Sequence, residues 1–275
     1  MLPRLLPNLV DMPMNLGDHL HELRKRLMLP IASIVVVFFV AFAFNAELKL
    51  LLVRPLRQAI ALIDPAAALK LGLSTDSSRL LTPLTLQEST LLSAQVSFDA
   101  ALAVTIPVLL YQLWMFVATG LKAAERRLAF LFVPFGVILF YSGCLVGYFW
   151  GLPYFFAWLM EWQAADPVAS SFFLGMGLYH AFFLNMTICF GLIMDIPWAV
   201  MVLVRVGFVS IAQFSRLRRV VAIINLILAA IITPTTDLFS LMVMFVPMQL
   251  LFEGGLLASR LMMWMKARRE ARGVR

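Results

Sequence analysis

Charge is the property this sequence has least of. Only 13% of its 275 residues are Asp, Glu, Lys or Arg, whereas 62% are hydrophobic and the mean hydropathy is +0.92. A soluble globular domain is typically about 25% charged and about 45–50% apolar. The scarcity of charge therefore excludes an ordinary soluble domain and predicts an all-α polytopic membrane protein.

Cysteine and histidine are also scarce, with two and three residues respectively. Cys144 and Cys189 lie inside apolar runs, so we expect small buried side chains there rather than a disulfide or metal ligands. No GxSxG, HExxH or P-loop pattern occurs. The sequence therefore predicts no enzyme, no cofactor and no metal site, and nothing in it supports an intramembrane hydrolase. The first fifteen residues lack the apolar run of a cleavable signal peptide, so we expect the first membrane helix to target the chain.

Long apolar runs are what the sequence does contain. Because about 20 apolar residues cross a hydrocarbon core of about 30 Å as a helix, these runs predict six transmembrane helices. The expected spans cover residues 27–44, 96–117, 128–150, 179–204, 220–233 and 238–252. The last two are short for a full crossing. They could form one re-entrant hairpin or two true spans in a locally thinned bilayer, and we favour the two short spans.

Basic residues are distributed unequally between the two sides of this predicted bundle. The side that holds both termini receives 17 of the 22, including a basic tail over residues 260–275, and the external loop 45–95 receives the others. The positive-inside rule then places both termini in the cytoplasm. The positive-inside rule accounts for the net charge of +7, so we expect no nucleic-acid partner. Within the external loop, Glu47 to Ile63 has helical apolar spacing and predicts an amphipathic segment over the outer face.

One acidic residue, Asp195, lies inside the fourth expected span. At 100° per residue, His180, Thr187, Gly191 and Asp195 share one helix face. Ionisable residues inside a membrane are functional candidates and usually face the bundle interior or a water-filled cavity. One alternative is an aspartate satisfied by polar groups of the bundle. Another is an ion-coupled small-solute transporter that uses Asp195 as its proton site. Asp99, close to the start of its span, is expected to reach the outer interface.

Two glutamates, Glu22 and Glu125, lie on the predicted cytoplasmic side in the most basic segments. On a helix Glu22 can pair with Arg26 or Lys25, which contributes only about 0.2–0.5 kcal/mol. Glu125 can favour the N-terminal dipole of the third span. Each acid alone is therefore ordinary, but both are expected at the same membrane surface.

Five segments of the chain carry a family resemblance. They are "HLHELRKRL" at 19–27, "IPVLLYQLWMFVATGLKAAERRL" at 106–128, "FGLIMDIPWAV" at 190–200, "ITPTTDLFS" at 232–240 and "LFEGGLLASR" at 251–260. Together, in this order, they closely resemble the TatC family, the multispanning core of the twin-arginine protein translocase.

The resemblance implies a receptor for folded proteins that carry a twin-arginine signal peptide. In the family, two glutamates receive the two arginines, and they match Glu22 and Glu125 here. Phe116 matches an aromatic residue at the edge of that site. Basic neighbours such as Arg24 are expected to reject generic cationic peptides.

The resemblance also implies a glove-shaped, concave bundle in the bacterial plasma (inner) membrane. Asp195 matches the intramembrane acidic position, and Pro55 and Glu253 match family positions, Pro55 as a structural residue of the external face. Thr233 and Leu241 match the docking surface for the single-span partners TatA and TatB. Transport driven by the proton-motive force, contact with membrane lipid and a homo-oligomer within the complex are further expectations.

Overall fold

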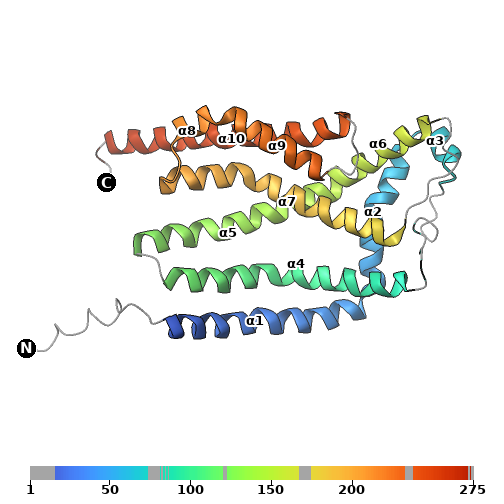
Figure 1. The fold of residues 1–275 in the computed structure, drawn as a ribbon, viewed down its shortest axis with the longest axis horizontal. Helices are drawn as coiled ribbons and strands as arrows, with labels where there is room; N and C mark the ends of the chain where they lie inside the picture. Colours follow the sequence, from blue (N-terminus) through green and yellow to red (C-terminus); the bar gives the residue numbers. More distant parts are fainter. Residues whose placement is uncertain are drawn as a thin grey trace, which may run out of the picture. The chain divides into compact units, whose positions relative to one another are not determined.

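The structure is a computed structural model that describes residues 16–73, 81, 83, 85, 87–119, 123–166, 175–232, 238–271 and 273. All its secondary-structure elements over these residues are helices, which confirms the all-α prediction (Figure 1). In chain order they are α1 (Leu16–Ala43), α2 (Asn45–Leu62), α3 (Pro65–Lys70), α4 (Glu88–Thr119), α5 (Ala123–Val146), the π-helical turn η1 (Gly147–Gly151), α6 (Leu152–Ala165), α7 (Met176–Val206), α8 (Ile211–Arg216), α9 (Arg218–Ile232) and α10 (Leu238–Ala271).

The chain divides into two compact units, and each is described by itself. Unit 1 comprises residues 1–48 and 93–133, and so contains α1, most of α4 and the start of α5. Unit 2 comprises residues 49–92 and 134–275, which include most of α2, all of α3, the first turn of α4 and everything from the rest of α5 to α10.

Four helical segments in the described part of the chain are long and apolar enough to cross a membrane. They are Arg24–Ala43, Glu88–Leu113, Val133–Ala165 and Met176–Arg205. Large apolar side chains point outward from them, such as Phe39 and Ile138, each 67% exposed. Helices satisfy their own backbone hydrogen bonds, so they can present such surfaces to lipid. These segments correspond to the first four expected spans, and α9 and α10 cover the last two. Six spans and cytoplasmic termini stay predictions.

Two helices extend beyond the ends that the sequence predicts for them. The third apolar helix was expected to end at Trp150, but it continues through η1 into α6 and ends at Ala165. Pro153 is tolerated there because it lies in the first turn of α6, directly after the π-helical turn. The last helix continues from Phe252 to Ala271, so much of the expected basic tail is helical. Membrane thickness does not limit helix length once a helix leaves the hydrocarbon core.

Glycines set the closest approaches between the helices of unit 2. A Cβ atom at Gly255 of α10 would lie 2.6 Å from the Cα atom of Pro197 in α7. Two turns earlier on α7, the ring of Phe190 occupies the space above Gly147 and Gly151, where added Cβ atoms would lie 2.7 Å and 2.3 Å from it. Because these positions lack a side chain, α7 can pack against both α10 and the α5–η1 segment.

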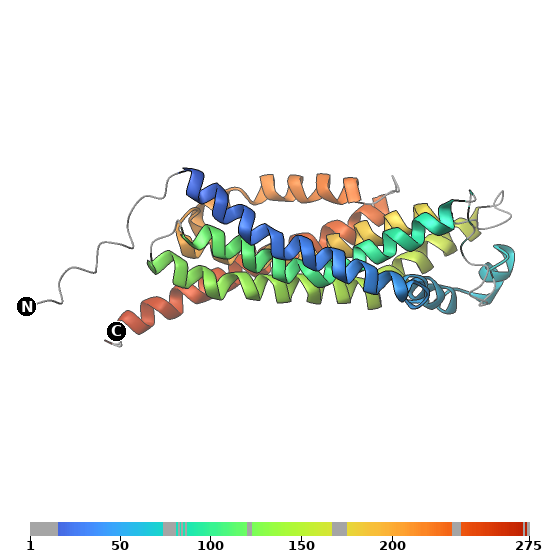
Figure 2. The same ribbon diagram turned by 90° about the horizontal axis from the view of Figure 1, so that it is seen from below.

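One apolar cluster joins four helices at one end of unit 2. Val200 of α7 packs with Phe252 and Leu256 of α10, and all three are at most 4% exposed. Phe214 of α8 and Val221 of α9 pack against this cluster. The helix α10 runs obliquely past α9, which is visible in Figure 2. The cluster thereby fixes the short helix α8 to the longer helices.

Candidate functional site

The predicted acceptor residue Glu22 lies in the second turn of α1. This helix runs without interruption from Leu16 to Ala43, so the motif around Glu22 and the first apolar run form one helix. Arg24, two residues later, is exposed, and Arg26 is half-buried. The side chain of Glu22 lies outside the described residues, so its pairing with Arg26 stays a prediction.

The other predicted acceptor, Glu125, is the third residue of α5. Phe116 is in the last turn of α4 and is half-buried. Only three residues separate the end of α4 at Thr119 from the start of α5, so the two helix ends are close. The start of α1 lies at this same end of unit 1 in both views (Figures 1 and 2). The backbone therefore brings the three predicted site positions to one end of unit 1, while the Glu125 side chain itself is outside the described residues.

Asp195 lies one turn after a point of close packing between α7 and α5. Gly191, one turn earlier, packs against Phe140 and Cys144 of α5, where an added Cβ atom would lie 2.6 Å and 2.8 Å from their side chains. Asp195 is half-buried, and its Oδ1 atom is buried with no hydrogen-bond partner in the described part of the chain. An unsatisfied buried acceptor costs about 1–3 kcal/mol, and more when it is charged. This carboxyl group therefore destabilises the fold locally.

The other two polar residues of the predicted stripe, Thr187 and His180, carry no unpartnered buried atom among the described residues. Thr187 donates its hydroxyl to the carbonyl oxygen of Phe183 at 2.8 Å, within its own helix. His180 is buried, at 7% exposed. Of the predicted stripe, Asp195 alone combines burial with an atom that lacks a partner among the described residues.

Pro55 occupies the middle of α2 and is fully buried. A proline has no N–H, so it leaves the carbonyl oxygen of Leu51, four residues earlier, without its helical donor. The hydroxyl of Tyr148 in η1 donates to this oxygen at 2.8 Å. The hydroxyl of Tyr179 in α7 donates to the next carbonyl oxygen, that of Leu52, at 2.7 Å. Pro55 thus frees the Leu51 carbonyl for Tyr148, and the separate bond from Tyr179 to Leu52 attaches α2 to a second segment of unit 2.

Two charged side chains of the predicted external loop cap distant helices. Glu88, at the start of α4, accepts a hydrogen bond from the backbone N–H of Gly177 in the first turn of α7, at 2.6 Å. Lys70, the last residue of α3, donates to the carbonyl oxygens of Ala164 and Asp166 at the end of α6. Each charge has the sign that a helix dipole favours at that terminus. Sequence reasoning missed both caps because their partners are about 90 residues away along the chain.

The last two helices are joined by polar contacts. Arg218 of α9 and Glu253 of α10 form an ion pair with an N–O distance of 2.9 Å, and Asn225 donates to Gln249 at 3.1 Å. Glu253 was expected to match a family position, and this ion pair supplies a structural role for it. Of the two residues predicted for partner docking, Leu241 is half-buried in the first turn of α10. Thr233 lies outside the described residues.

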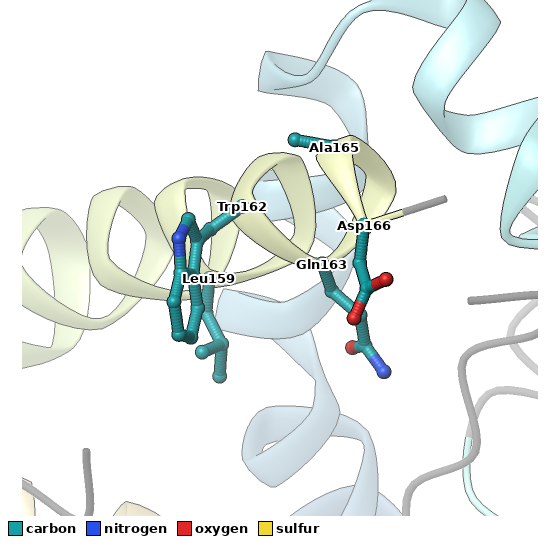
Figure 3. Close-up of a pocket in the computed structure, with 5 residues that line it drawn as sticks. All are labelled: Leu159, Trp162, Gln163, Ala165 and Asp166. Carbon is teal, nitrogen blue, oxygen red and sulfur yellow. The ribbon is translucent and has the colours of Figure 1, made fainter. Parts of the chain in front are cut away.

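A recess of about 470 Å³ lies at the end of α6. Figure 3 shows Leu159 and Trp162 on one side of the helix end and Gln163 and Asp166 on the other. None of the predicted site residues lines it, so it is not part of the candidate site. Within the described ranges no group of three His, Cys, Asp or Glu side chains could hold a metal ion.

The close contact between α5 and α7 was not predicted, although a regular spacing of glycines in the sequence indicates it. Gly143, Gly147 and Gly151 recur every four residues, a spacing of small residues that typically lets transmembrane helices approach closely. All three meet α7, and at Gly143 an added Cβ atom would lie 2.6 Å from the carbonyl oxygen of Phe190. Their spacing could have identified the α5–α7 contact in advance.

Comparison with known proteins gives one consistent result. The family described as Sec-independent protein translocase protein (TatC) matches residues 18–247. The TatC protein of Halothiobacillus neapolitanus is 35% identical over 242 residues, which is 88% of this chain and 61% of that protein, so the chain spans less than two thirds of this relative. TatCy of Bacillus subtilis is 32% identical over 247 residues, covering 90% of this chain and 89% of that protein.

A solved structure agrees with these relatives. The crystal structure of a twin-arginine translocase receptor, TatC, superposes with a TM-score of 0.67 at 25% sequence identity, covering 88% of this chain and 98% of that one. The agreement confirms the resemblance that the five sequence segments indicated. The chain therefore belongs to the TatC family of Sec-independent protein translocase proteins.

Proposed function

We propose that this chain is the receptor and core subunit of a twin-arginine protein translocase in a bacterial plasma membrane. It binds the twin-arginine signal peptide of a folded precursor at Glu22 and Glu125, with Phe116 beside them. The observation that carries the proposal is that the start of α1, the end of α4 and the start of α5 share one end of unit 1. The name of the similar crystal structure, a twin-arginine translocase receptor, supports the same role.

The chemistry of the two glutamates fits a pair of arginines. A guanidinium group presents parallel N–H donors that match the two oxygens of a carboxylate, and a lysine ammonium does not reproduce this geometry. Two arginines require two such acceptors. Glu125 is in the first turn of α5, where the backbone N–H groups already favour an anion, so its carboxylate is stable before the signal arrives.

The basic neighbours of Glu22 provide selectivity. Arg24 is exposed on the same turn of α1, and Lys25 and Arg26 follow it. These charges repel a cationic peptide that lacks the arginine geometry. In the resting state Arg26 is positioned one turn after Glu22 and pairs with it, so the incoming signal competes for this carboxylate.

The proposal extends to topology and partners. Six spans form a concave, glove-shaped bundle with both termini in the cytoplasm, and α9 and α10 supply the two short spans. TatA and TatB subunits dock on this part of the chain near Thr233 and Leu241, and several copies of the chain assemble in the complex. The proton-motive force drives transport. Asp195 serves this transport cycle, and the alternative of an ion-coupled small-solute transporter has no observation of its own to support it.

Photo-crosslinking to a twin-arginine precursor tests the proposed site. We expect a crosslinker next to position 22 or 125 to capture the signal peptide. Glu22→Ala and Glu125→Ala should each weaken capture, and the double variant should abolish it without unfolding the protein. A precursor with both arginines replaced by lysine should behave like the double variant.

Glu161 provides the matched control, because it is an exposed glutamate on α6 in unit 2. Glu161→Ala removes the same charge and should leave capture unchanged. Capture that persists in the double variant would disprove the assignment of the two acceptors.

A further inference from the structure

Four exposed arginines gather where α7 ends and α8 begins, at one end of unit 2. They come from four different helices and are called here the arginine patch: Arg205 of α7, Arg216 of α8, Arg219 of α9 and Arg260 of α10. Figure 1 shows the end of α7, the helix α8 and the C-terminal half of α10 together at this end. The patch lies outside unit 1, which contains the proposed signal-peptide acceptors.

Side-chain contacts tie two of these arginines, Arg205 and Arg260, to neighbouring helices. The Nη2 atom of Arg260 donates to the hydroxyl of Ser215 at 3.0 Å, beside Arg216 on α8. The Nη1 atom of Arg205 contacts the sulfur of Met262 at 3.7 Å, two residues after Arg260 on α10. These two contacts connect α7 and α8 to neighbouring positions of α10, so Arg205, Arg216 and Arg260 lie on adjacent helices at this end of unit 2.

The helix that carries Arg216 is itself well anchored. Ser210 and Gln213 form a reciprocal capping box at the start of α8. The ring of Phe214 packs against Phe252 of α10 with a centroid distance of 6.0 Å. Arg216 is therefore carried by an anchored helix rather than by a loop.

The positive charge of the patch is not neutralised by the described side chains around it. Glu253, the acidic residue of this region, forms its ion pair with Arg218 at 2.9 Å. No described carboxylate lies within ion-pair distance of Arg205, Arg216, Arg219 or Arg260. Four guanidinium groups are thus available to an external anion.

Exposed apolar side chains flank these charges. Gly207 ends α7 with a φ angle of 87°, and the chain then turns so that Phe208 is 79% exposed. Leu217, between α8 and α9, is 45% exposed. Arginines next to exposed aromatic and aliphatic side chains are typical of the membrane interface, where the apolar group enters the lipid and the cation meets the headgroup.

We propose that the arginine patch, together with Phe208 and Leu217, binds the phosphate of an anionic phospholipid at the membrane surface. Guanidinium groups bind phosphate through paired N–H donors. Basic surfaces between helices at the cytoplasmic face are known to hold anionic headgroups. A free phosphate ion or an acidic peptide would satisfy the charges but would leave the two apolar side chains exposed, and so a lipid fits both halves of the surface.

Lipid binding to the purified full chain tests the proposal by native mass spectrometry. We expect the protein to retain phosphatidylglycerol in preference to phosphatidylcholine with the same acyl chains. Arg216→Gln and Arg219→Gln should each weaken phosphatidylglycerol binding by roughly five-fold, and the double variant by roughly 25-fold. Phe208→Ser should weaken lipid binding while all four charges remain.

The control has the same net charge as the double variant. Lys266→Gln combined with Arg268→Gln removes two positive charges from the end of α10, outside the patch, and should leave the preference unchanged. Unaltered elution and melting temperature verify folding, and Phe208→Ser supplies a second measurement if the double variant does not fold. The lipid assignment would be overturned if both lipids were retained equally or if the control lost as much binding as the double variant. Displacement of the lipid by excess inorganic phosphate, or tighter binding of an acidic peptide, would also overturn it.

Discussion

The hydroxyl of Tyr148 lies 2.8 Å from the carbonyl oxygen of Leu51, the backbone acceptor that Pro55 leaves without a helical donor. A proline that would be costly in a continuous helix is thus used to join α2 to the π-helical turn. Tyr179 adds a second hydroxyl contact to α2, at the carbonyl oxygen of Leu52, at 2.7 Å. The Tyr148 contact explains the expected structural role of Pro55, because the proline leaves the Leu51 carbonyl oxygen free to accept the bond.

This mechanism predicts a coupling between Pro55 and Tyr148. Tyr148→Phe should lower the free energy of unfolding by about 1 kcal/mol, because it leaves the Leu51 carbonyl unpaired. Pro55→Ala restores an N–H for that carbonyl, so Tyr148→Phe should cost almost nothing in this background. A double-mutant cycle by thermal unfolding in detergent measures the coupling. Additive effects of the two substitutions would contradict it.

The two adjacent glycines of α10 should respond oppositely to alanine. Gly255→Ala places a methyl group 2.6 Å from the backbone of Pro197, which cannot move aside as a side chain would. We expect it to lower stability by about 1–3 kcal/mol. At Gly254 an added Cβ atom meets nothing within 4 Å, so Gly254→Ala should raise stability by about 0.5–1 kcal/mol through helix propensity.

Melting temperatures of the two purified glycine variants provide the measurement. Each variant is the control for the other, because the substitution, the helix and the membrane depth are nearly the same. Equal shifts would show that α10 and α7 do not make the close contact at Gly255.

The cap that Glu88 provides to α7 should contribute measurably to stability. Glu88→Ala leaves the N–H of Gly177 without its acceptor and removes a negative charge from a helix N-terminus, which should cost about 1–2 kcal/mol. Glu47→Ala is the control, since Glu47 is an exposed glutamate on α2. Hydrogen exchange of the first turn of α7 reports the effect directly. Unchanged protection in Glu88→Ala would exclude the capping role.

Asp195 should show a conflict between stability and transport. Its buried Oδ1 atom lacks a partner among the described residues, so Asp195→Leu should raise the melting temperature. The same substitution should block export of a twin-arginine precursor, and Asp195→Asn should retain part of it if a polar group suffices. Export assays in cells, with the melting temperature measured on the purified variants, distinguish the outcomes. Normal export by both variants would show that Asp195 is not essential.

The sequence predicted the features that depend on local composition. Apolar runs identify helices that can lie in lipid, because every backbone polar group must be satisfied within the segment. The motifs around Glu22 and Glu125 identified the family, because each is a short run of residues that can be recognised in the sequence without knowing the fold. The amphipathic spacing of residues 47–63 likewise predicted the helix α2. Helix ends were less predictable, because Gly151 and Pro153 follow Trp150 and two glycines follow Phe252, residues that often end a helix, and yet both helices continue past them.

Only the tertiary structure decided the contacts between segments that are distant in sequence. Tyr148 bonds to Leu51 and Glu88 accepts from Gly177, and Gly255 packs against Pro197. The partners in each pair are too far apart in the sequence for a local pattern to predict the contact. Each depends on orientation, since a hydroxyl, a carboxylate or a missing side chain acts only when folding brings its partner within a few ångströms. The sequence by itself thus determined that the chain is helical, apolar and of the TatC family. The packing determined which of its prolines, glycines and charged residues hold those helices together.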